Sequence, residues 1–204
     1  LLRDFISNKL HHYHEERNDP DRDVTSLLSP YLHFGQVAPV KVALAVIDNR
    51  EGNEVSVTDF LDELIVRREL SFNFVNYNGN YDNINCLPAW ARETLRVNSS
   101  VEREYIYSLS GFENCATHDS FWNASQNQLV TTGIIHNYMR MYWGKKIIEW
   151  TESPDIAYRY MVYLNNKYAL DGNDPNSFAG IAWCFGKHDR PWANRPVFGK
   201  VRYM

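Results

Sequence analysis

The chain has 204 residues, of which 44% are hydrophobic and 23% are charged, proportions that are typical of a folded globular protein and argue against a disordered or fibrous one. Its formal net charge is −4, so overall charge does not mark it as a binder of polyanions. The longest apolar run, residues 42–47, is far shorter than the ~20 residues that cross a bilayer. We therefore expect no membrane contact, and no secretory signal is visible at the start of the sequence.

Apolar residues recur with helical spacing along most of the chain. Hydroxyl residues are placed to cap two of the predicted helices: Thr58 caps the long one that runs to residue 74, and Ser100 caps the one at 101–109. Pro154, directly after Ser153, suits the first position of a helix. A polar loop at 76–85 and a proline-containing tail interrupt the pattern. The predicted helices span residues 1–14, 37–47, 58–74, 88–95, 101–109, 120–128, 133–150 and 154–168.

No segment shows the alternation and tight turns of β-hairpins, so we expect a single all-α domain over residues 1–204. The sequence contains no GxGxxG, Walker or HExxH motif, and a nucleotide cofactor would have to be held in a non-Rossmann way. The three cysteines, Cys86, Cys115 and Cys184, form neither a CxxC pair nor an even disulfide framework. Reduced thiols indicate an intracellular compartment, the nucleus or the cytoplasm, and nothing in the composition suggests an oligomer rather than a monomer.

A histidine cluster near the N-terminus is the first candidate site. His11 and Glu15 are four residues apart on the predicted helix, so they share a face and could grip a metal ion. His12 and His14 adjoin them. Histidines that merely end a polar helix give the same pattern and are commoner, so we assign no metal.

The segment 25–35 places three hydroxyl residues, Thr25, Ser26 and Ser29, before or at the start of a turn or short helix containing Pro30. Hydroxyls and free backbone N–H groups at a helix start suit a phosphate. The same residue types also cap helices that bind no ligand, and the residues alone leave both interpretations open.

Aromatic residues are abundant, with 6 Trp and 13 Tyr. Trp143 and Trp150 lie seven residues apart on one predicted helix, so they share a face with an axial offset of about 10 Å. Trp122 lies on the preceding helix. Indoles at helical spacing usually belong to a core, but three of them could pass an electron in short hops if a light-absorbing cofactor were bound.

Arg140 lies among apolar residues of the same predicted helix, and a buried arginine needs a carboxylate partner. Asp171 is the candidate, because its loop follows the next helix and returns toward this one. A structural ion pair and a role beside a cofactor are both compatible with this pairing.

The last twenty residues are basic although the chain as a whole is acidic. Such a local face could meet phosphates, and a solvated surface explains the charge equally well. The segment has one acid, Asp189, and its basic residues are Lys187, Arg190, Arg195, Lys200 and Arg202.

Five longer motifs stand out in the sequence, and GIIHNYMRMYWGKKIIEW at 133–150 is the most specific of them. The others are SLLSPYLHFGQ at 26–36, ELIVRREL at 63–70, FWNA at 121–124 and RPVFGKVRYM at 195–204. In sequence and in order, with matches from about Tyr13 to Met204, they resemble the class II cyclobutane pyrimidine dimer (CPD) photolyases of the photolyase/cryptochrome family.

The resemblance implies the all-helical C-terminal domain of such an enzyme, holding a U-shaped FAD that is active when reduced. The family's N-terminal α/β domain, which can hold an antenna chromophore, would be absent from this chain. The motifs place Asn165 at the central nitrogen of the flavin, and they place the Arg140–Asp171 pair beside the isoalloxazine. The residues that would hold the FAD phosphates and ribityl chain are Tyr13, Thr25, Ser26, Leu27 and Ser29.

The same motifs imply roles in electron transfer and DNA binding. The proximal, middle and distal electron carriers of the family match Trp150, Trp122 and Trp143. The cavity for the dimer would be lined by Glu63, Met141 and Trp183. The DNA-facing residues would be Arg17 and Asn18 after the first helix and Lys200 and Arg202 in the basic tail.

Two positions depart from the family pattern: Arg67 stands where some relatives have Trp against the dimer, and Asn173 replaces an Arg. The implied activity is light-driven repair, in which reduced FAD gives an electron to a flipped-out CPD and the electron returns after the ring splits. A cryptochrome-like photosensor without repair activity is the main alternative. A helical nucleic-acid-binding module without flavin is the second, and retention of Asn165, Arg140 and Asp171 counts against it.

Overall fold

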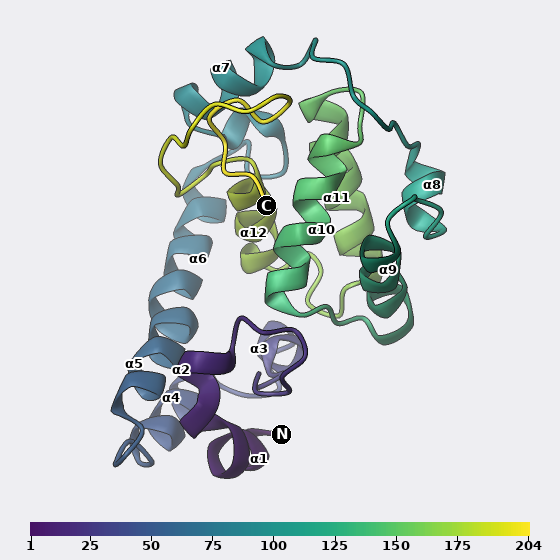
Figure 1. Cartoon of the computed structure of the whole chain (residues 1–204). Helices are drawn as coiled ribbons and strands as arrows, with labels where there is room; N and C mark the ends of the chain where they lie inside the picture. The colour runs from purple at the N-terminus through teal and green to yellow at the C-terminus, as the bar shows by residue number, and fades with distance from the viewer. The chain divides into compact units, whose positions relative to one another are not determined.

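The protein is helical without a β-sheet in the computed structural model, which describes residues 1–204, and this confirms the all-α prediction (Figure 1). A single β-bridge joins Arg195 and Gly199. Short π-helical turns lie at Phe5–Lys9 and Asp62–Arg67, and 3₁₀ turns lie at Leu10–His12 and Ile84–Cys86. The α-helices are α1 (Leu2–Asp4), α2 (Tyr13–Glu16), α3 (Ser29–His33), α4 (Pro39–Ile47), α5 (Glu54–Leu61), α6 (Arg68–Tyr77), α7 (Ala89–Val97), α8 (Leu109–Glu113), α9 (Ser120–Thr132), α10 (Asn137–Glu149), α11 (Pro154–Tyr168) and α12 (Pro175–Cys184).

Most of the predicted helices are present, with ends that differ by a few residues. The first is a chain of short helical pieces from α1 to α2, because a π-helical turn interrupts the regular hydrogen-bond register. The start of α11 is as predicted: Pro154 occupies its first turn, and the Ser153 hydroxyl accepts a hydrogen bond from the Ile156 N–H at 3.3 Å. None of the helices combines the length and the apolar character that crossing a bilayer requires.

The prediction of Thr58 as an N-cap was wrong. The helix already starts at Glu54, after Asn53, and Thr58 lies inside it. Its hydroxyl donates to the Glu54 carbonyl at 2.7 Å, a back-bond that hydroxyl residues make within helices. The acidic Glu54 in the first turn favours the earlier start, since the N-terminal end of a helix attracts negative charge.

The prediction of a helix at 101–109 after Ser100 was also wrong, because this segment is irregular up to Ser108. Its backbone bonds elsewhere: the Tyr107 N–H donates to the Trp150 carbonyl at 2.9 Å. A helix starts only at α8, where the Ser108 hydroxyl accepts from the Gly111 N–H at 3.2 Å. A long-range contact thus overrides the local pattern.

Helix α12 has no counterpart among the predicted helices, although its start signals are ordinary ones. Pro175 is in its first turn, and the Asp174 carboxylate accepts a hydrogen bond from the Asn176 N–H at 2.9 Å. The helix is apolar on most of its circumference and buries Phe178, Ile181 and other residues. Such a helix shows little amphipathic periodicity, which is the signal that sequence reading relies on.

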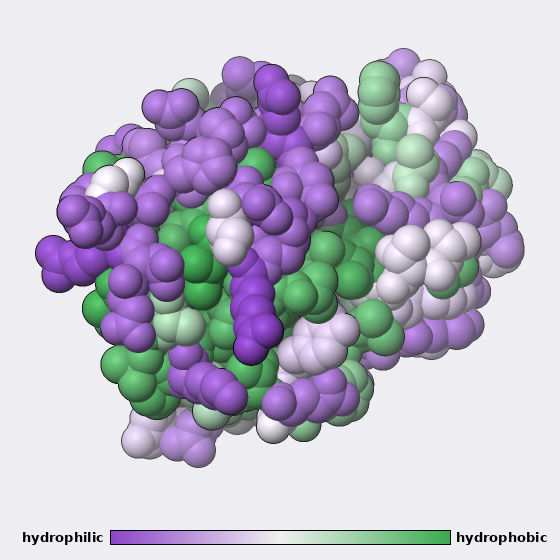
Figure 2. Space-filling view, turned by 90° about the horizontal axis from the view of Figure 1, so that it is seen from below, coloured by the Kyte–Doolittle hydropathy of each residue, from purple (hydrophilic) through white to green (hydrophobic).

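Contacts divide the chain into two compact units, Leu1–Phe72 and Asn73–Met204, each with a buried core of its own. That the two act as one domain stays a prediction. In the N-terminal unit the aromatic rings of Phe5, Tyr13 and Phe60 pack within 4.8–5.7 Å of one another. Apolar residues also reach the surface in patches among polar ones (Figure 2), and Phe34 is 63% exposed.

The C-terminal unit is built around α10, which contacts α9, α11 and α12. Figure 1 shows α10 and α11 running alongside each other. Gly144 makes the close approach to α11 and α12 possible, because a Cβ there would lie 2.5 Å from Met161 Cε and 2.7 Å from Cys184 Sγ. Gly133 ends α9 with a φ of +72°, in the left-handed region that glycine enters without strain. The turn between α9 and α10 is therefore set by glycine chemistry.

Candidate functional site

Three indoles form a continuous buried stack in the C-terminal unit. Trp122 on α9 lies parallel to Trp143 on α10, with ring centroids 6.4 Å apart and planes inclined by 7°. Trp150, which follows α10, meets Trp122 edge to face at 6.3 Å and 65°. The three are at most 4% exposed. Trp122 therefore connects the two indoles that share one face of α10.

Hydrogen bonds fix the orientation of two of these rings. Trp122 Nε1–H donates to the Trp143 carbonyl at 3.0 Å, and Trp143 Nε1–H donates to Gln126 Oε1 at 2.8 Å. Gln126 is itself fully buried on α9. Buried indole N–H groups need such acceptors. Because both acceptors are held in place, the two rings stay in contact.

The predicted ion pair is present three residues before Trp143. Arg140 Nη2 lies 3.2 Å from Asp171 Oδ1, and the two side chains are 24% and 17% exposed. Arg140 Nη1 also donates to Asn165 Oδ1 at 3.4 Å. Asn165, on α11, is 2% exposed. The structure thus gathers a cation, a carboxylate and a buried amide from α10, α11 and the loop before α12.

A fully buried cation lies one and a half turns further along α10. Lys145 is 2% exposed and donates to the Cys184 carbonyl at the end of α12. Burial lowers the pKa of Lys145 to about 8. Cys184 Sγ lies 3.8 Å from Met141 Sδ. Lys145 and Met141 therefore both tie α10 to the end of α12, where Trp183 is found.

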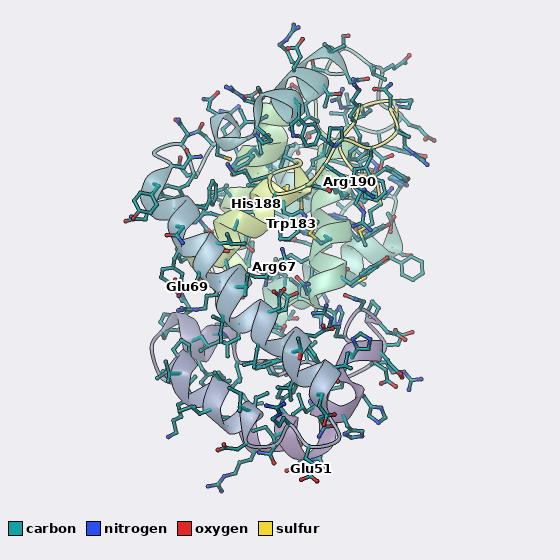
Figure 3. The ribbon with its side chains drawn as sticks, turned by 90° about the vertical axis from the view of Figure 1, so that its left-hand side faces the viewer. Glu51, Arg67, Glu69, Trp183, His188 and Arg190 are labelled. Atoms are coloured by element: carbon teal, nitrogen blue, oxygen red, sulfur yellow. The ribbon has the colours of Figure 1, made fainter.

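Trp183 is partly exposed near the end of α12, and the ring of His188 meets it at 6.2 Å and 65° (Figure 3). Of the three residues that the motifs place at the dimer, Met141 and Trp183 belong to this unit and Glu63 belongs to the N-terminal unit.

Glu63 belongs to a network of ion pairs in the N-terminal unit. Its Oε1 atom lies 3.1 Å from Arg17 Nη1. Arg17 Nη2 lies 3.4 Å from Asp59 Oδ2, and His14 Nδ1 lies 2.9 Å from the same oxygen. The guanidinium of Arg17 also lies 5.4 Å from the ring centroid of Tyr13. Glu63 is thus paired with the very arginine that the motifs assign to DNA.

Arg67 is the first departure from the family pattern. Its Nε donates to Asp62 Oδ2 at 3.1 Å. These two residues and Glu63 belong to the π-helical turn Asp62–Arg67, where the ordinary i, i+4 relation of an α-helix does not hold. Asn173, the second departure, has a φ of +61°, which asparagine tolerates better than most residues.

The hydroxyl-rich segment lies in the same unit, before α3. Leu27 has a φ of +54°, and the Ser26 hydroxyl accepts from the Leu28 N–H at 3.4 Å. The hydroxyls of Thr25 and Ser29 make no hydrogen bond within the protein, and no side chain caps α3. These groups remain available to an anionic ligand. Tyr13, which precedes this segment in the sequence, is buried, and this burial raises the pKa of its phenol.

The histidines at the N-terminus do not form a metal centre, because no group of three ligating side chains gathers there. His12 lies 3.7 Å from Glu16, and His14 pairs with Asp59 as described. Asn18, beside Arg17, is exposed.

The basic tail forms an exposed surface of cations and rings in the C-terminal unit. Arg190 and Arg202 both lie over the ring of Trp192, at 5.5 and 5.1 Å from its centroid. Arg195 lies 5.1 Å from the ring centroid of Tyr203. Neither these arginines nor Lys200 forms an ion pair within the protein. Cations of this kind are free to meet phosphates.

Each unit, taken by itself, holds groups of the kind that a flavin nucleotide needs. In the N-terminal unit, unpaired hydroxyls and an uncapped helix start suit a pyrophosphate. In the C-terminal unit, the buried Asn165 amide and the Arg140–Asp171 pair offer the planar donors and acceptors that the edge of a flavin ring requires. Sequence reasoning missed the supporting residues Gln126 and Asp59, since no local motif indicates a partner that is distant in sequence.

Comparison with curated proteins finds similarity along the whole chain. It is 54% identical over 204 residues to a deoxyribodipyrimidine photo-lyase of Methanothermobacter thermautotrophicus, covering 100% of this chain and 45% of that protein. It is 46% identical over 205 residues to the protein of that name from Potorous tridactylus, covering 100% and 38%. The Arabidopsis thaliana protein of that name is 48% identical over 202 residues, covering 98% and 41%. The chain spans less than half the length of these relatives.

No family model matches the chain. Among solved structures, a bacterial class III photolyase from Agrobacterium tumefaciens superimposes with a TM-score of 0.70, covering 91% of this chain and 36% of that one. At 22% sequence identity this likeness supports the helical fold.

Proposed function

We propose that this chain, which belongs by sequence to the deoxyribodipyrimidine photo-lyases along its whole length, is the helical catalytic region of a class II enzyme that repairs CPDs in DNA with light. The observation that carries the proposal is the buried stack of Trp122, Trp143 and Trp150, which starts one helical turn from the Arg140–Asp171 pair. A stack of oxidisable rings sealed from water suits a photochemical redox enzyme.

FAD is the cofactor that these residues would hold, and in its reduced form it supplies the electron that light drives into the dimer. Arg140 and Asp171 orient each other, so that each would present a fixed edge to the isoalloxazine. The Asn165 amide would hydrogen-bond the central nitrogen of the flavin. Arg140 holds this amide in place through Oδ1.

The N-terminal unit would contribute the phosphate-binding groups. The hydroxyls of Thr25 and Ser29, which lack a protein partner, would donate to phosphate oxygens. The positive φ of Leu27 turns the backbone between Ser26 and α3, which leaves the N–H groups at the helix start available. Tyr13 would pack its buried ring against the ligand.

The order of the electron carriers follows from helix geometry. Trp143 is three residues from Arg140 on α10, a rise of about 4.5 Å, whereas Trp150 is ten residues away, a rise of about 15 Å. Since Arg140 marks the flavin end of α10, we propose that electrons reach the flavin from Trp143, which is refilled from Trp122 and then from Trp150. This order is the reverse of the one that the family motifs imply.

DNA containing a pyrimidine dimer is the proposed substrate. Glu63, once released from Arg17, would lie at a dimer carbonyl, and Met141 and Trp183 would contact the flipped bases. Arg17, Asn18, Lys200 and Arg202 would hold the flanking phosphates. We further propose a monomer in the nucleus or cytoplasm, with any antenna chromophore bound outside these 204 residues.

Two measurements on the purified chain test the proposal. The absorbance spectrum should show a bound flavin. After reduction and under blue light, the chain should restore the bases of a dimer-containing oligonucleotide, and it should not do so in the dark. Bound flavin without repair would favour a photosensor, and absence of flavin after reconstitution would exclude both.

A further inference from the structure

The indole nitrogens of Trp122 and Trp143 both bond to carbonyl oxygens. Trp122 Nε1–H donates to the main-chain carbonyl of Trp143 at 3.0 Å, and Trp143 Nε1–H donates to the side-chain carbonyl oxygen of Gln126, Oε1, at 2.8 Å. The three residues are at most 1% exposed. Each indole proton is therefore sealed from water and bonded to an oxygen that is not a base.

The Gln126 amide is held at one end only. Its Oε1 has to face Trp143, because an indole N–H is a donor and requires an acceptor. Its Nε2 is buried and has no hydrogen-bond partner. A buried donor without a partner is costly, and folded proteins keep few of them. A residue that is kept at such a cost points to a role for its carbonyl group at Trp143.

The choice of an amide has a chemical consequence. An indole that loses an electron becomes a radical cation, and its N–H is then far more acidic than in the neutral ring. A glutamate has nearly the same shape as glutamine, but its carboxylate would take this proton. A methionine would fill the space without accepting the hydrogen bond. Glutamine accepts the bond and leaves the proton on the indole.

The ionisable groups around the stack are occupied elsewhere. Asp119 caps α9, where its Oδ1 accepts from the Trp122 backbone N–H at 2.9 Å and its Oδ2 accepts from the Tyr142 hydroxyl. The imidazole of His118 meets the stack at Trp150, at 4.7 Å and 63°, and has no ring contact with the other two indoles. The Gln126 carbonyl is thus the group that decides what happens to the Trp143 proton.

We propose that Gln126 is a positioning residue that keeps the indole proton on Trp143 when this tryptophan is oxidised; the inference rests on the electron path of the proposed function. Trp143 gives one electron to the photoexcited oxidised flavin and becomes a radical cation, and its proton stays on Nε1. One electron from Trp122 then restores neutral Trp143. One electron leaves, one arrives and no proton moves, so charge and electrons balance.

The consequence is that the stack carries electrons without waiting for protons. A proton that left Trp143 would have to return before the indole was restored, and the radical would be trapped at this ring. The hydrogen bond belongs to Trp143 itself, so the role of Gln126 is the same for either order of the carriers.

Gln128 provides a matched control on the same helix. It lies two residues after Gln126 on α9, and its side chain is exposed. Its side chain bonds to no indole. Q128E therefore adds the same charge to α9 as Q126E without offering a base to Trp143.

The test is transient absorption of the flavin-loaded chain after a light flash, at alkaline pH so that an introduced carboxyl is ionised even when buried. The cationic and neutral tryptophan radicals differ in visible absorption. Q126E should raise the share of the neutral radical several-fold over the parent and slow its decay in D₂O, and Q128E should match the parent. Equal shares of neutral radical in the parent, Q126E and Q128E would overturn the assignment.

Two further outcomes separate this inference from the proposed function. Bound flavin that produces no tryptophan radical overturns the electron path itself, and this inference with it. Proton NMR of the unaltered chain needs neither flavin nor variants. The Nε1–H of Trp143 should exchange with D₂O far more slowly than that of Trp192, which is 41% exposed. Equal exchange rates at the two indoles would refute the sealed hydrogen bond to Gln126.

Discussion

The two units treat charged side chains in opposite ways. In the N-terminal unit, the ion pairs of Arg17 with Glu63 and Asp59 join side chains that are 25–47% exposed. In the C-terminal unit, Arg140 and Asp171 are 24% and 17% exposed, and Lys145 is 2% exposed. Exposed pairs contribute about 0–1 kcal/mol to folding, whereas a buried charge that loses its partner is costly. The Arg17 network therefore contains exposed charges that can change partners, whereas the Arg140–Asp171 pair and Lys145 are held in fixed positions.

Loss of bound flavin is the largest expected effect, and it tests the fixed side of this comparison. Arg140→Ala leaves Asp171 as a partly buried carboxylate without its cation, and we expect a loss of about 2–3 kcal/mol in the free energy of unfolding together with loss of bound flavin. Thermal melting and flavin absorbance measure both. Arg159, exposed on α11, is the control, and R159A should leave both unchanged. An R140A variant with full flavin content and parental melting would refute the role of the pair.

The pH dependence of stability tests the burial of Lys145. Its pKa falls from the usual 10.5 to about 8 in the folded chain, so between these values the unfolded chain holds a proton that the folded chain has released. The free energy of unfolding should therefore gain a contribution that rises from pH 8 toward pH 10, by up to about 3 kcal/mol. Denaturant unfolding of K145M, compared with K41M on the exposed face of α4, should show the slope lost only in K145M. Equal slopes in both variants would place Lys145 in contact with water.

Substitutions of Glu63 test the exposed charges that can change partners. Because it is exposed and paired with Arg17, E63Q and E63A should leave the melting temperature nearly unchanged. Repair yield per photon should differ: Gln keeps a hydrogen-bond donor for the dimer carbonyl, and Ala loses a bond to a charged group worth about 1.5–3 kcal/mol. We expect a several-fold lower yield for E63A alone, with E69A as the control on α6. Equal yields for Gln and Ala forms would leave Glu63 as a surface charge.

The smallest expected effect concerns the basic tail. Arg202 and Lys200 have no carboxylate partner, so R202E and K200E should cost little stability. Each should weaken damaged and undamaged DNA alike and reduce the slope of log affinity against log salt by about 1 for each lost phosphate contact. K41E is the charge-matched control. Loss of affinity for the dimer alone would instead place these residues at the lesion.

Periodicity predicted α4, α9 and α11 because each buries one face and exposes another. It failed for α12, which is apolar nearly all round, and for the segment 101–109, whose Tyr107 backbone bonds Trp150 instead of its own helix. Long-range hydrogen bonds of this kind leave no trace in local spacing.

In the candidate site, too, some contacts could be predicted from the sequence and others could not. The Arg140–Asp171 pair could be predicted, because a charge inside an apolar helix requires a partner. Helix spacing placed Trp143 and Trp150 on one face but could not show that Trp122 lies between them. The contact of His118 with Trp150 depends on two irregular segments, for which the sequence offers no periodic pattern.

The order of the electron carriers is tested most directly by flash photolysis of the flavin-loaded chain with one indole replaced at a time. If Trp143 is nearest to the flavin, W143F should form no tryptophan radical. W150F should still form one on Trp143 and Trp122, and this radical should recombine quickly with the reduced flavin. W192F, at an exposed indole outside the stack, should behave as the parent. A tryptophan radical in W143F, together with its absence in W150F, would contradict this order and make Trp150 the nearest carrier.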